Sequence, residues 1–338
     1  MENDNIVVSI CCLTYNHEKY VRKTLEGFFS QKTEFKFEVL INDDASTDGT
    51  VKIIKEFEAK YPGTIKPVYQ TENQYSKRKK MNSEFLFMNA RGKYIAMCEG
   101  DDYWTDDRKL QKQYEILERH QDCSVSTHIV SWIKEDGSTL DKIFPPNIIR
   151  PGIVTPEDYM QSEVGNIEWT FQTSSYFFRT RDIWGLCESR PDFLINSIVE
   201  DLPIMLYLIT KGNIYYLPEN MSCYRLGSSS SVTKTTVKQK EKVCDYYKNQ
   251  IECMKEYNEY TQSRFDKYID KYIRHYEYTI LLLQRDFRKM MQERYSDNWN
   301  QLSIYRKVYY RILRYCPGFH YIGDIYNLSK TKSHHRET

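Results

Sequence analysis

Short apolar runs alternate with segments of helical periodicity over the first hundred residues, and this alternation leaves few folds open to the chain. Residues 6–12 are apolar almost throughout, which is typical of a strand buried on both faces of a parallel sheet. Gly92 follows a short helical segment, where a left-handed glycine commonly ends a helix. The order strand, helix, strand predicts an α/β fold with a mostly parallel, Rossmann-like sheet and helices on both faces. We predict strands over residues 6–12, 37–41, 65–69 and 94–98, and helices over residues 16–30, 47–59 and 83–90.

The pattern changes after about residue 124 and divides the chain. Residues 233–338 are helical, rich in tyrosine and basic, with 21 Lys and Arg against 13 Asp and Glu, whereas residues 1–232 contain 27 against 34. We therefore predict an acidic main domain over residues 1–232 and a helical extension over residues 233–338. Within the main domain we predict strands over residues 125–133, 173–179 and 213–218, and helices that begin near residues 155 and 199.

Charge, cysteine spacing and hydropathy exclude several classes of protein. The net charge is +1, so the whole chain is no polycation of the kind that binds nucleic acid. The nine cysteines include no C-x-x-C pair, which disfavours a zinc site, and we expect reduced thiols. The chain starts without a basic cap and apolar stretch, and no run of about 18 apolar residues follows. We therefore expect a cytoplasmic protein without a membrane span.

Polar segments follow three of the predicted strands directly. They are residues 13–17, 42–49 and 99–102, and the last two are rich in carboxylates. Ligands of open α/β sheets bind at the carboxyl ends of the strands. We therefore expect a binding site where these three segments meet.

The segment over residues 99–102 (Glu-Gly-Asp-Asp) is the strongest local signal. Adjacent carboxylates at a strand end repel one another. Mg²⁺ or Mn²⁺, which typically takes one or two carboxylates together with substrate phosphates, removes that cost. The alternative is that an aspartate caps the helix predicted from Asp106. Tyr103 and Trp104 next to the segment indicate a partly apolar pocket wall.

The other two strand-end segments offer contacts for a nucleoside. The Asp44 carboxylate can accept hydrogen bonds from a base or a ribose hydroxyl, and we favour ligand contact for this residue. Asp43 and Asp48 can instead shape the turn, and we favour helix capping for Asp48. Tyr15 can stack on a flat base; a plain turn between strand and helix is the alternative.

Two further charged segments leave their roles open. Residues 77–80 (Lys-Arg-Lys-Lys) could contact phosphate from a closed loop, but a solvated surface run explains most of them equally simply. Glu200 and Asp201 open a predicted helix, whose dipole alone would stabilise carboxylates. One of the two could instead deprotonate a hydroxyl nucleophile.

Taken together, these segments resemble those of glycosyltransferase family 2, whose members have the GT-A fold. Order and spacing fit over about residues 6–230, and the combination is specific although each motif alone is common. The chain has Glu99 where members commonly have Asp, and Leu13 where they commonly have Pro; neither change removes a needed carboxylate. The matching segments are residues 8–10, 14–16, 42–50, 92–95, 99–104 and 200–201.

The resemblance implies that a sugar nucleotide binds at this edge, with uridine as the expected base. Leu13, Tyr15 and Asp44 would contact its base and ribose. Asp101 would also face the donor, and Lys80 of the basic run would contact its diphosphate. Residues 1–232 would then be a GT-A catalytic domain.

The resemblance also implies transfer with inversion at the anomeric carbon. Asp102, with Asp101 beside it, would hold Mn²⁺ or Mg²⁺ and so stabilise the charge that grows on the leaving nucleoside diphosphate. Asp201 would take the proton of the acceptor hydroxyl, with Glu200 beside it holding the acceptor or orienting the site. Arg225 could add positive charge; a surface arginine is the alternative.

Three further features could surround the sugar. Trp169 and Gln172 could line its pocket, because an indole packs well on the apolar face of a sugar; core packing is the alternative for Trp169. Residues 227–231, a glycine and serines, could close over the donor.

The segment over residues 304–315 predicts a helix that is cationic on one side and aromatic and aliphatic on the other. Such a helix can lie on an anionic membrane surface, which would suit a peripheral protein with a lipid-linked glycan acceptor. The alternative, which we favour slightly, is that its aromatic face packs on the catalytic domain; the two are compatible.

We therefore expect a metal-dependent inverting glycosyltransferase of surface polysaccharide synthesis, with a nucleotide-sugar donor, a glycan or lipid-linked glycan acceptor and no nucleic-acid partner. A catalytically silent relative that binds sugar nucleotide or glycan is the main alternative. A nucleotidyltransferase should carry a glycine-rich phosphate loop near its start, and residues 13–20 contain no glycine. A dinucleotide dehydrogenase is disfavoured because no G-x-G-x-x-G occurs.

Overall fold

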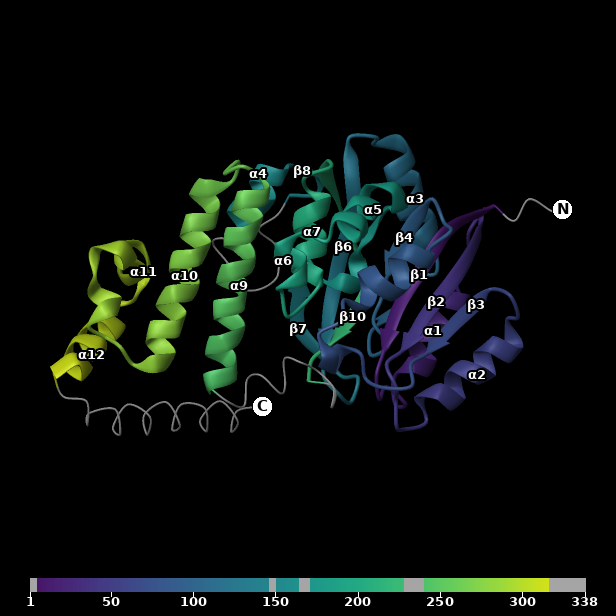
Figure 1. Ribbon diagram of the computed structural model, residues 1–338, viewed down its shortest axis with the longest axis horizontal. Coiled ribbons are helices and arrows are strands. Elements are labelled where there is room, and N and C mark those ends of the chain that lie inside the picture. The colour runs from purple at the N-terminus through teal and green to yellow at the C-terminus, as the bar shows by residue number, and fades with distance from the viewer. Residues whose placement is uncertain (1–4, 146–149, 164–170, 228–239, 316–338) are drawn as a thin grey trace.

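A computed structural model of the protein describes residues 5–145, 150–163, 171–227 and 240–315. Within these described residues, one sheet of ten strands extends from β1 to β10, with helices around it, and the C-terminal helices lie at one end of the molecule (Figure 1). The strands that come first in the chain lie toward the opposite end.

The first four strands form a parallel sheet, as the sequence predicts. They are β1 (Ile6–Thr14), β2 (Lys36–Asp43), β3 (Ile65–Tyr69) and β4 (Tyr94–Met97), in the spatial order β3-β2-β1-β4. The helices between them are α1 (Val21–Phe29) and α2 (Thr50–Lys60), both close to their predicted positions.

The predicted helix over residues 83–90 is present in an irregular form, as a π turn (Asn82–Leu86) followed by a 3₁₀ turn (Phe87–Asn89).

The prediction that Gly92 ends this helix with a left-handed backbone is wrong, because Gly92 is not among the glycines with positive φ. A Cβ at Gly92 would lie 2.5 Å from the Ser9 nitrogen and 2.7 Å from the Val8 carbonyl carbon. Gly92 is therefore required by the close approach of β1 and not by a helix end.

The second part of the sheet is mixed. It contains β5 (Tyr103–Trp104), β6 (Cys123–Ile133), β7 (Thr139–Phe144), β8 (Gly152–Val154), β9 (Phe177–Arg179) and β10 (Asn213–Arg225). The short strand β9 lies antiparallel between β4 and β6, and β10 runs parallel to β6. The α/β class is thus confirmed, with antiparallel strands joined to a parallel half.

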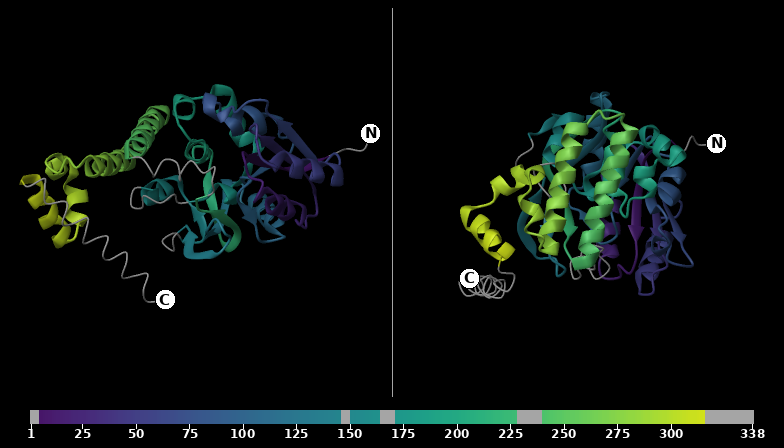
Figure 2. Two further views of the ribbon diagram at one scale, coloured as in Figure 1. Left: turned by 90° about the horizontal axis from the view of Figure 1, so that it is seen from below. Right: turned by 60° about the vertical axis from the view of Figure 1, so that its left-hand side comes forward.

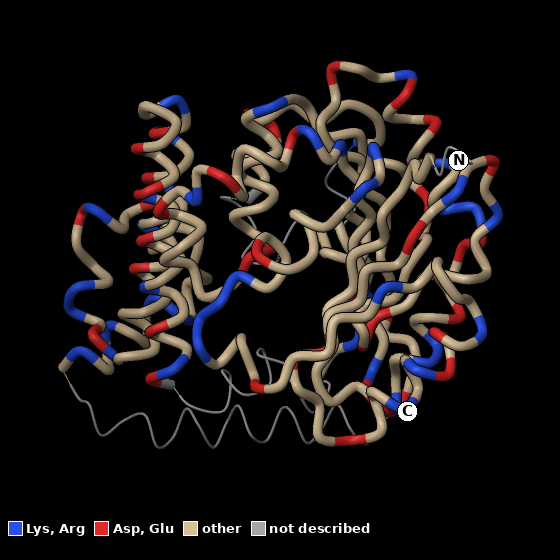
Figure 3. Tube along the Cα trace, turned by 45° about the vertical axis from the view of Figure 1, so that its right-hand side comes forward, with Lys and Arg blue, Asp and Glu red and all other residues tan. Residues whose placement is uncertain are grey.

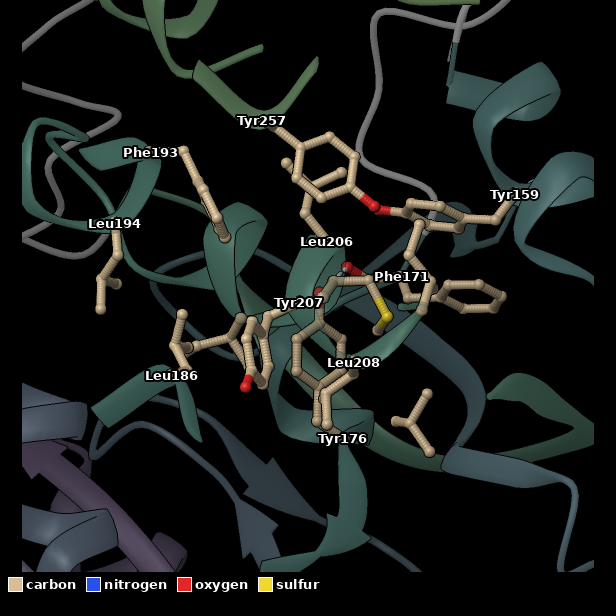
Figure 4. Close-up of a cluster of buried hydrophobic side chains, with 14 of the residues drawn as sticks. Tyr159, Phe171, Tyr176, Leu186, Phe193, Leu194, Leu206, Tyr207, Leu208 and Tyr257 are labelled. Atoms are coloured by element: carbon tan, nitrogen blue, oxygen red, sulfur yellow. Dashed lines mark hydrogen bonds between the residues drawn. The ribbon is translucent and has the colours of Figure 1, made fainter. Parts of the chain in front are cut away.

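Helices cover both faces of the sheet, as predicted. The remaining helices of this region are α3 (Lys109–Arg119), α4 (Pro156–Glu163), α5 (Thr180–Ser189), α6 (Asp192–Ile195) and α7 (Asp201–Leu208). Successive residues of β2 point to opposite faces, so Val39 and Ile41 pack with α1, α2 and α3, whereas Leu40 packs with α5 and α7. Helix α7 is buried almost all round, and Figure 4 shows Leu206, Tyr207 and Leu208 inside this second core.

The C-terminal helices are α9 (Lys240–Tyr260), α10 (Asp266–Gln284), α11 (Ser296–Gln301) and α12 (Ile304–Tyr315). Helix α9 packs on α6, and its Tyr257 lies against Phe193 (Figure 4). The first extension helices therefore complete a core of the main domain, while α11 and α12 lie farther out (Figure 2). None of the described helices combines the length and the apolar character needed to cross a membrane.

Candidate active site

Backbone hydrogen bonds join the three polar segments at the carboxyl edge of the sheet. The Asp44 nitrogen donates to the Thr14 carbonyl at 2.9 Å, and the Gly100 nitrogen donates to the Leu13 carbonyl at 2.8 Å. The segments that follow β1, β2 and β4 therefore lie side by side. We refer to this region below as the carboxyl edge.

The turn after β1 is locked to the turn after β2. Asn16 has a left-handed backbone with φ 55°, a conformation that asparagine tolerates. Its nitrogen donates to the Ser46 hydroxyl at 2.8 Å, and its side-chain oxygen accepts from the Thr47 nitrogen at 2.8 Å. Asp48 accepts from the nitrogen and hydroxyl of Thr50 at the start of α2 and so shapes the turn before the helix, but the N-cap position itself is Gly49 and not Asp48.

The acidic segment after β4 is held from below by α1. The Thr24 hydroxyl lies 3.0 Å from the Gly100 carbonyl and 2.5 Å from the Asp102 carbonyl. A Cβ at Gly100 would lie 2.9 Å from atoms of His17 and Thr14, so only glycine lets the segment turn here without a shift.

Arg225, at the end of β10, clamps the same segment from the other side. Its backbone nitrogen donates to Asp102 Oδ1 at 2.8 Å, and its Nε donates to the Asp101 carbonyl at 3.0 Å. The guanidinium lies 4.4 Å from the centroid of the Tyr20 ring and also donates to two backbone carbonyls after β6. The alternative that Arg225 is a surface arginine is therefore wrong, because the residue is buried.

The carboxylates at the carboxyl edge interact electrostatically, and this interaction shifts their pKa values. Burial, followed by the charges of Asp101 and Asp201, raises the pKa of Glu99 to about 8. Burial, followed by the charges of Asp101 and Glu99, raises the pKa of Asp102 above its ordinary value. Burial also raises the pKa of Asp201, the first residue of α7, against the hydrogen bond that its carboxylate accepts from Leu202. The charge of Asp201 thus acts on Glu99, which lies about a hundred residues earlier in the sequence.

The donor set fits a hard divalent cation that also binds a substrate. Within the described ranges, no three His, Cys, Asp or Glu side chains are arranged around one point that could hold a metal. Asp102 and Asp101 offer oxygen atoms, which Mg²⁺ and Mn²⁺ prefer, and such ions commonly complete their shell with phosphate oxygens. A cation here would therefore depend on a diphosphate.

Asp44 holds the loop after β3. Its two carboxylate oxygens accept from the Gln74 nitrogen at 2.6 Å and the Tyr75 nitrogen at 3.1 Å. This contact was not foreseen, since we expected Asp44 to face a nucleoside.

The anchored Tyr75 is a site residue that the sequence analysis missed. The side chain of Tyr75 is 41% exposed; its partial burial raises the pKa of its phenol, and the charges of Asp201 and Glu99 raise it further. No motif singles out Tyr75; its position just before the basic run was the one available hint.

Lys80 and Glu200 connect the same loop to α7. Lys80 is buried and its ammonium donates to the Ser197 carbonyl. Glu200 accepts from the Asn82 nitrogen at 2.8 Å and from the nitrogen and hydroxyl of Ser83 at 3.1 and 3.0 Å. The two oxygens of Glu200 thus cap the turn after Lys80. Lys77 and Lys79 form ion pairs with Glu72 and Glu84, as a surface run would.

The remaining predicted residues are placed as follows. Leu13 packs partly buried against the core, and Tyr15 is exposed beside it. Gln172 is buried. Trp169 and residues 228–231 lie outside the described residues. A separate hollow between α1 and α2 contains none of the predicted residues; the Arg22–Glu56 ion pair and the Phe29 and Tyr61 rings line it.

Comparison with known proteins gives a family and two kinds of relative. The sequence model of glycosyl transferase family 2 matches residues 9–183. An uncharacterized protein of Mycobacterium tuberculosis is 38% identical over 64% of this chain. The match covers 58% of that relative's own length. The putative teichuronic acid biosynthesis glycosyltransferase TuaG of Bacillus subtilis is 29% identical over 68% of this chain and 83% of its own length.

Among solved structures, the fold is similar to that of S. aureus TarS 1-349 in complex with UDP. The TM-score is 0.55 at 15% identity, and the match covers 89% of this chain and 77% of TarS 1-349. At this identity the likeness concerns the fold, which is thus of the GT-A glycosyltransferase type.

Proposed function

Because the chain belongs to glycosyltransferase family 2, we propose that it transfers a sugar from a nucleoside-diphosphate sugar to a hydroxyl group of a glycan or lipid-linked glycan, with inversion, in the cytoplasm. Uridine is the proposed base. A surface polysaccharide is the proposed product, since TuaG, a relative, is named for teichuronic acid biosynthesis.

One observation supports the proposal: the Asp201 carboxylate at the start of α7 acts electrostatically on Glu99, which follows β4. The charge of Asp201 contributes to the raised pKa of Glu99, so the two side chains lie within electrostatic reach. A donor held by the carboxylates after β4 would then meet an acceptor deprotonated by Asp201.

In the proposed reaction, Asp201 accepts the proton of the acceptor hydroxyl as its oxygen bonds to the anomeric carbon. The bond from that carbon to the diphosphate oxygen breaks on the opposite face, and the nucleoside diphosphate leaves. Asp102, with Asp101, would hold Mn²⁺ or Mg²⁺, which neutralises charge on the diphosphate. Burial raises the pKa of Asp201 and so makes it a better base than an exposed aspartate.

The donor contacts that we propose are Leu13, Tyr15 and Asp44. Asp44 would meet the ribose while its oxygens hold Gln74 and Tyr75, so donor binding and the position of this loop would be coupled. Lys80 would act at the diphosphate through the position of its segment, because its ammonium is engaged by Ser197.

Glu200 is proposed to position Asp201 by tying the start of α7 to Asn82 and Ser83. Tyr75 is assigned to the acceptor side, because Asp201 exerts the largest charge effect on its phenol. Substitution of Tyr75 by Ala should raise the KM for the acceptor about tenfold and leave the KM for the donor unchanged; Tyr75→Phe separates the ring from the hydroxyl. An equal rise in both values would remove this assignment.

The experiment is a panel of nucleotide sugars screened by thermal shift with and without Mn²⁺, followed by transfer assays with the sugars that bind. We expect stabilisation by one nucleoside diphosphate and its sugar, and release of the diphosphate with an acceptor present. Stabilisation without transfer to any glycan acceptor would favour the catalytically silent relative instead.

A further inference from the structure

Helix α12 has two apolar faces, and the described chain covers only one of them. Leu313 is 4% exposed and packs in a cluster with Phe287 and Met290, beside the rings of Tyr309 and Tyr310. This contact ties α12 to the end of α10. It accounts for one side of the helix, but the packing alternative named the wrong partner: this side packs on other residues of the extension and not on the catalytic domain.

The other side carries large apolar side chains in solvent. At 100° per residue its members fall within an arc of about 100° around the helix axis. We call them the outer face of α12: Ile304, Tyr305, Val308, Ile312 and Tyr315, with exposed fractions of 68%, 84%, 47%, 38% and 75%. Five such side chains on twelve residues exceed the scattered apolar exposure that soluble surfaces ordinarily show.

Basic residues border the outer face. Lys307, Arg311 and Arg314 lie along one side of it, and Arg306 lies farther round. The sequence of α12 contains no Asp or Glu. The helix is therefore a concentrated positive strip beside an apolar strip.

The cations of α12 are not neutralised by the described parts of the chain. Lys307 donates to the Asn300 carbonyl, and Arg311 lies 5.9 Å from the centroid of the Trp299 ring. Neither these two nor Arg306 and Arg314 enter an ion pair with a described residue.

Some cations elsewhere among the C-terminal helices do form ion pairs. On α10, Arg274 pairs with Asp270 at 2.8 Å, and Arg294 just beyond α10 pairs with Glu277 at 2.9 Å. Figure 3 shows acidic and basic residues interspersed over most of the chain. On α12, four cations that form no ion pair with the described chain lie on the same short helix as the uncovered apolar face.

We propose that the outer face of α12 binds the surface of an anionic lipid bilayer. Exposed cations next to aliphatic side chains suit anionic headgroups above a hydrocarbon boundary, and tyrosines near both ends suit the interface between them. Binding of this kind needs neither a shaped groove nor a defined partner residue. It also goes beyond the proposed transfer reaction, because it depends on neither donor nor acceptor.

The test uses the full chain and co-sedimentation with vesicles. We expect binding to phosphatidylcholine vesicles that contain phosphatidylserine, no binding to pure phosphatidylcholine, and loss of binding as salt is raised. The triple variant Lys307→Gln, Arg311→Gln, Arg314→Gln should bind the anionic vesicles at least tenfold more weakly. The triple variant Ile304→Ser, Val308→Ser, Ile312→Ser should lose binding at all salt concentrations.

A matched control removes the same charge elsewhere. Lys248, Lys267 and Lys271 are exposed on α9 and α10, and their replacement by Gln should leave vesicle binding within twofold of the parent. Equal losses in this control and in the α12 charge variant would overturn the proposal, since net charge alone would then act. So would absence of binding at low salt.

Sedimentation velocity separates a second copy of the chain from a lipid surface. If the outer-face variants convert a dimer to a monomer and leave vesicle binding unchanged, the outer face is a self-association surface and the proposal is wrong. Transfer to a soluble acceptor should be the same in all these variants, so failure of the transferase proposal would not affect the result.

Discussion

The carboxyl edge of the sheet and the outer face of α12 both concentrate charge of one sign, but they hold it in opposite ways. At the edge, Asp44 accepts hydrogen bonds from two backbone nitrogens, and buried Asp102 accepts one from Arg225. On α12, Lys307 and Arg311 are at the surface and form no ion pair with the described chain. The edge fixes individual carboxylate oxygens, whereas the contacts of Lys307 and Arg311 are with a backbone carbonyl and an aromatic ring.

This difference indicates which role the carboxylates of the edge and the cations of α12 are each suited to. Buried carboxylates that repel one another cost folding free energy, and proteins keep them where a bound cation or substrate offsets that cost. Exposed cations cost little and contribute little singly. We therefore expect single substitutions to have large effects at the edge and small effects on α12, and the predictions below test that ordering from the largest effect to the smallest.

The largest effect is expected for Asp201→Asn. An amide cannot accept the acceptor proton, so the transfer rate should fall about a thousandfold, the range for loss of a general base. Binding of the donor should persist, because Asp201 is not proposed to contact it. Transfer would be measured by diphosphate release, and donor binding by thermal shift.

A matched control and a pH profile sharpen this prediction. Asp192→Asn changes an exposed aspartate in the first turn of the neighbouring helix α6 and should leave transfer unchanged. Because burial raises the pKa of Asp201, the rate should fall as pH drops toward that raised pKa, at a higher pH than an exposed aspartate would give. Unchanged turnover in Asp201→Asn would end its assignment as the base.

The next effect is expected for Asp102→Asn. Mn²⁺ with the nucleoside diphosphate should stabilise the parent by about 3 kcal/mol at a hundredfold excess over Kd, and this gain should vanish in the variant. The amide keeps an oxygen for the Arg225 nitrogen and removes a carboxylate that Asp101 and Glu99 repel. The metal-free variant should therefore melt no lower than the parent, and a full metal-dependent shift in the variant would contradict the metal assignment.

Much of the carboxyl edge could be predicted from the local periodicity of the sequence. The strands β1 to β4 and their terminal polar segments follow from apolar runs and turn residues, since parallel strands bring their ends to one edge. The same periodicity predicts the amphipathic character of residues 304–315. The local sequence is sufficient to predict these features.

The rest depends on contacts between distant segments. The insertion of β9 between β4 and β6 is a matter of pairing across the fold, and residues 177–179 alone carry no sign of it. Arg225 lies 123 positions after the Asp102 that it holds. Which face of α12 is covered likewise depends on where α10 ends.

A buried basic side chain in the main domain tests whether burial, and not the sign of the charge, accounts for the difference between the two regions. Lys109 is fully buried, donates to Gln113 Oε1 at 2.7 Å and lies 4.2 Å from the centroid of the Trp104 ring. Burial lowers its pKa to about 7. Between pH 7 and 9 the unfolded chain therefore binds a proton that the folded chain lacks, so the stability of the fold rises with pH.

The substitution Lys109→Met should remove this pH dependence. From pH 7 to pH 9 the parent should gain about 2 kcal/mol of unfolding free energy relative to the variant, measured by urea denaturation at each pH. Lys112→Met, on the surface of the same helix, should keep the slope of the parent. A parallel pH dependence in the parent and Lys109→Met would show that Lys109 stays charged in the fold.

The smallest effect is expected for Tyr305→Ser on the outer face of α12. Tyr305 is 84% exposed, so the free energy of unfolding should change by no more than about 0.5 kcal/mol, and transfer should be unaffected. Leu313→Ala on the same helix is the contrasting variant, because Leu313 is buried. Its truncation should lower the free energy of local unfolding around α12 by about 2–3 kcal/mol, measured by hydrogen exchange. If Tyr305→Ser destabilised the protein as much as Leu313→Ala, the outer face would already be covered in solution. Its charges would then be held like those of the carboxyl edge, and the contrast between the two regions would fail.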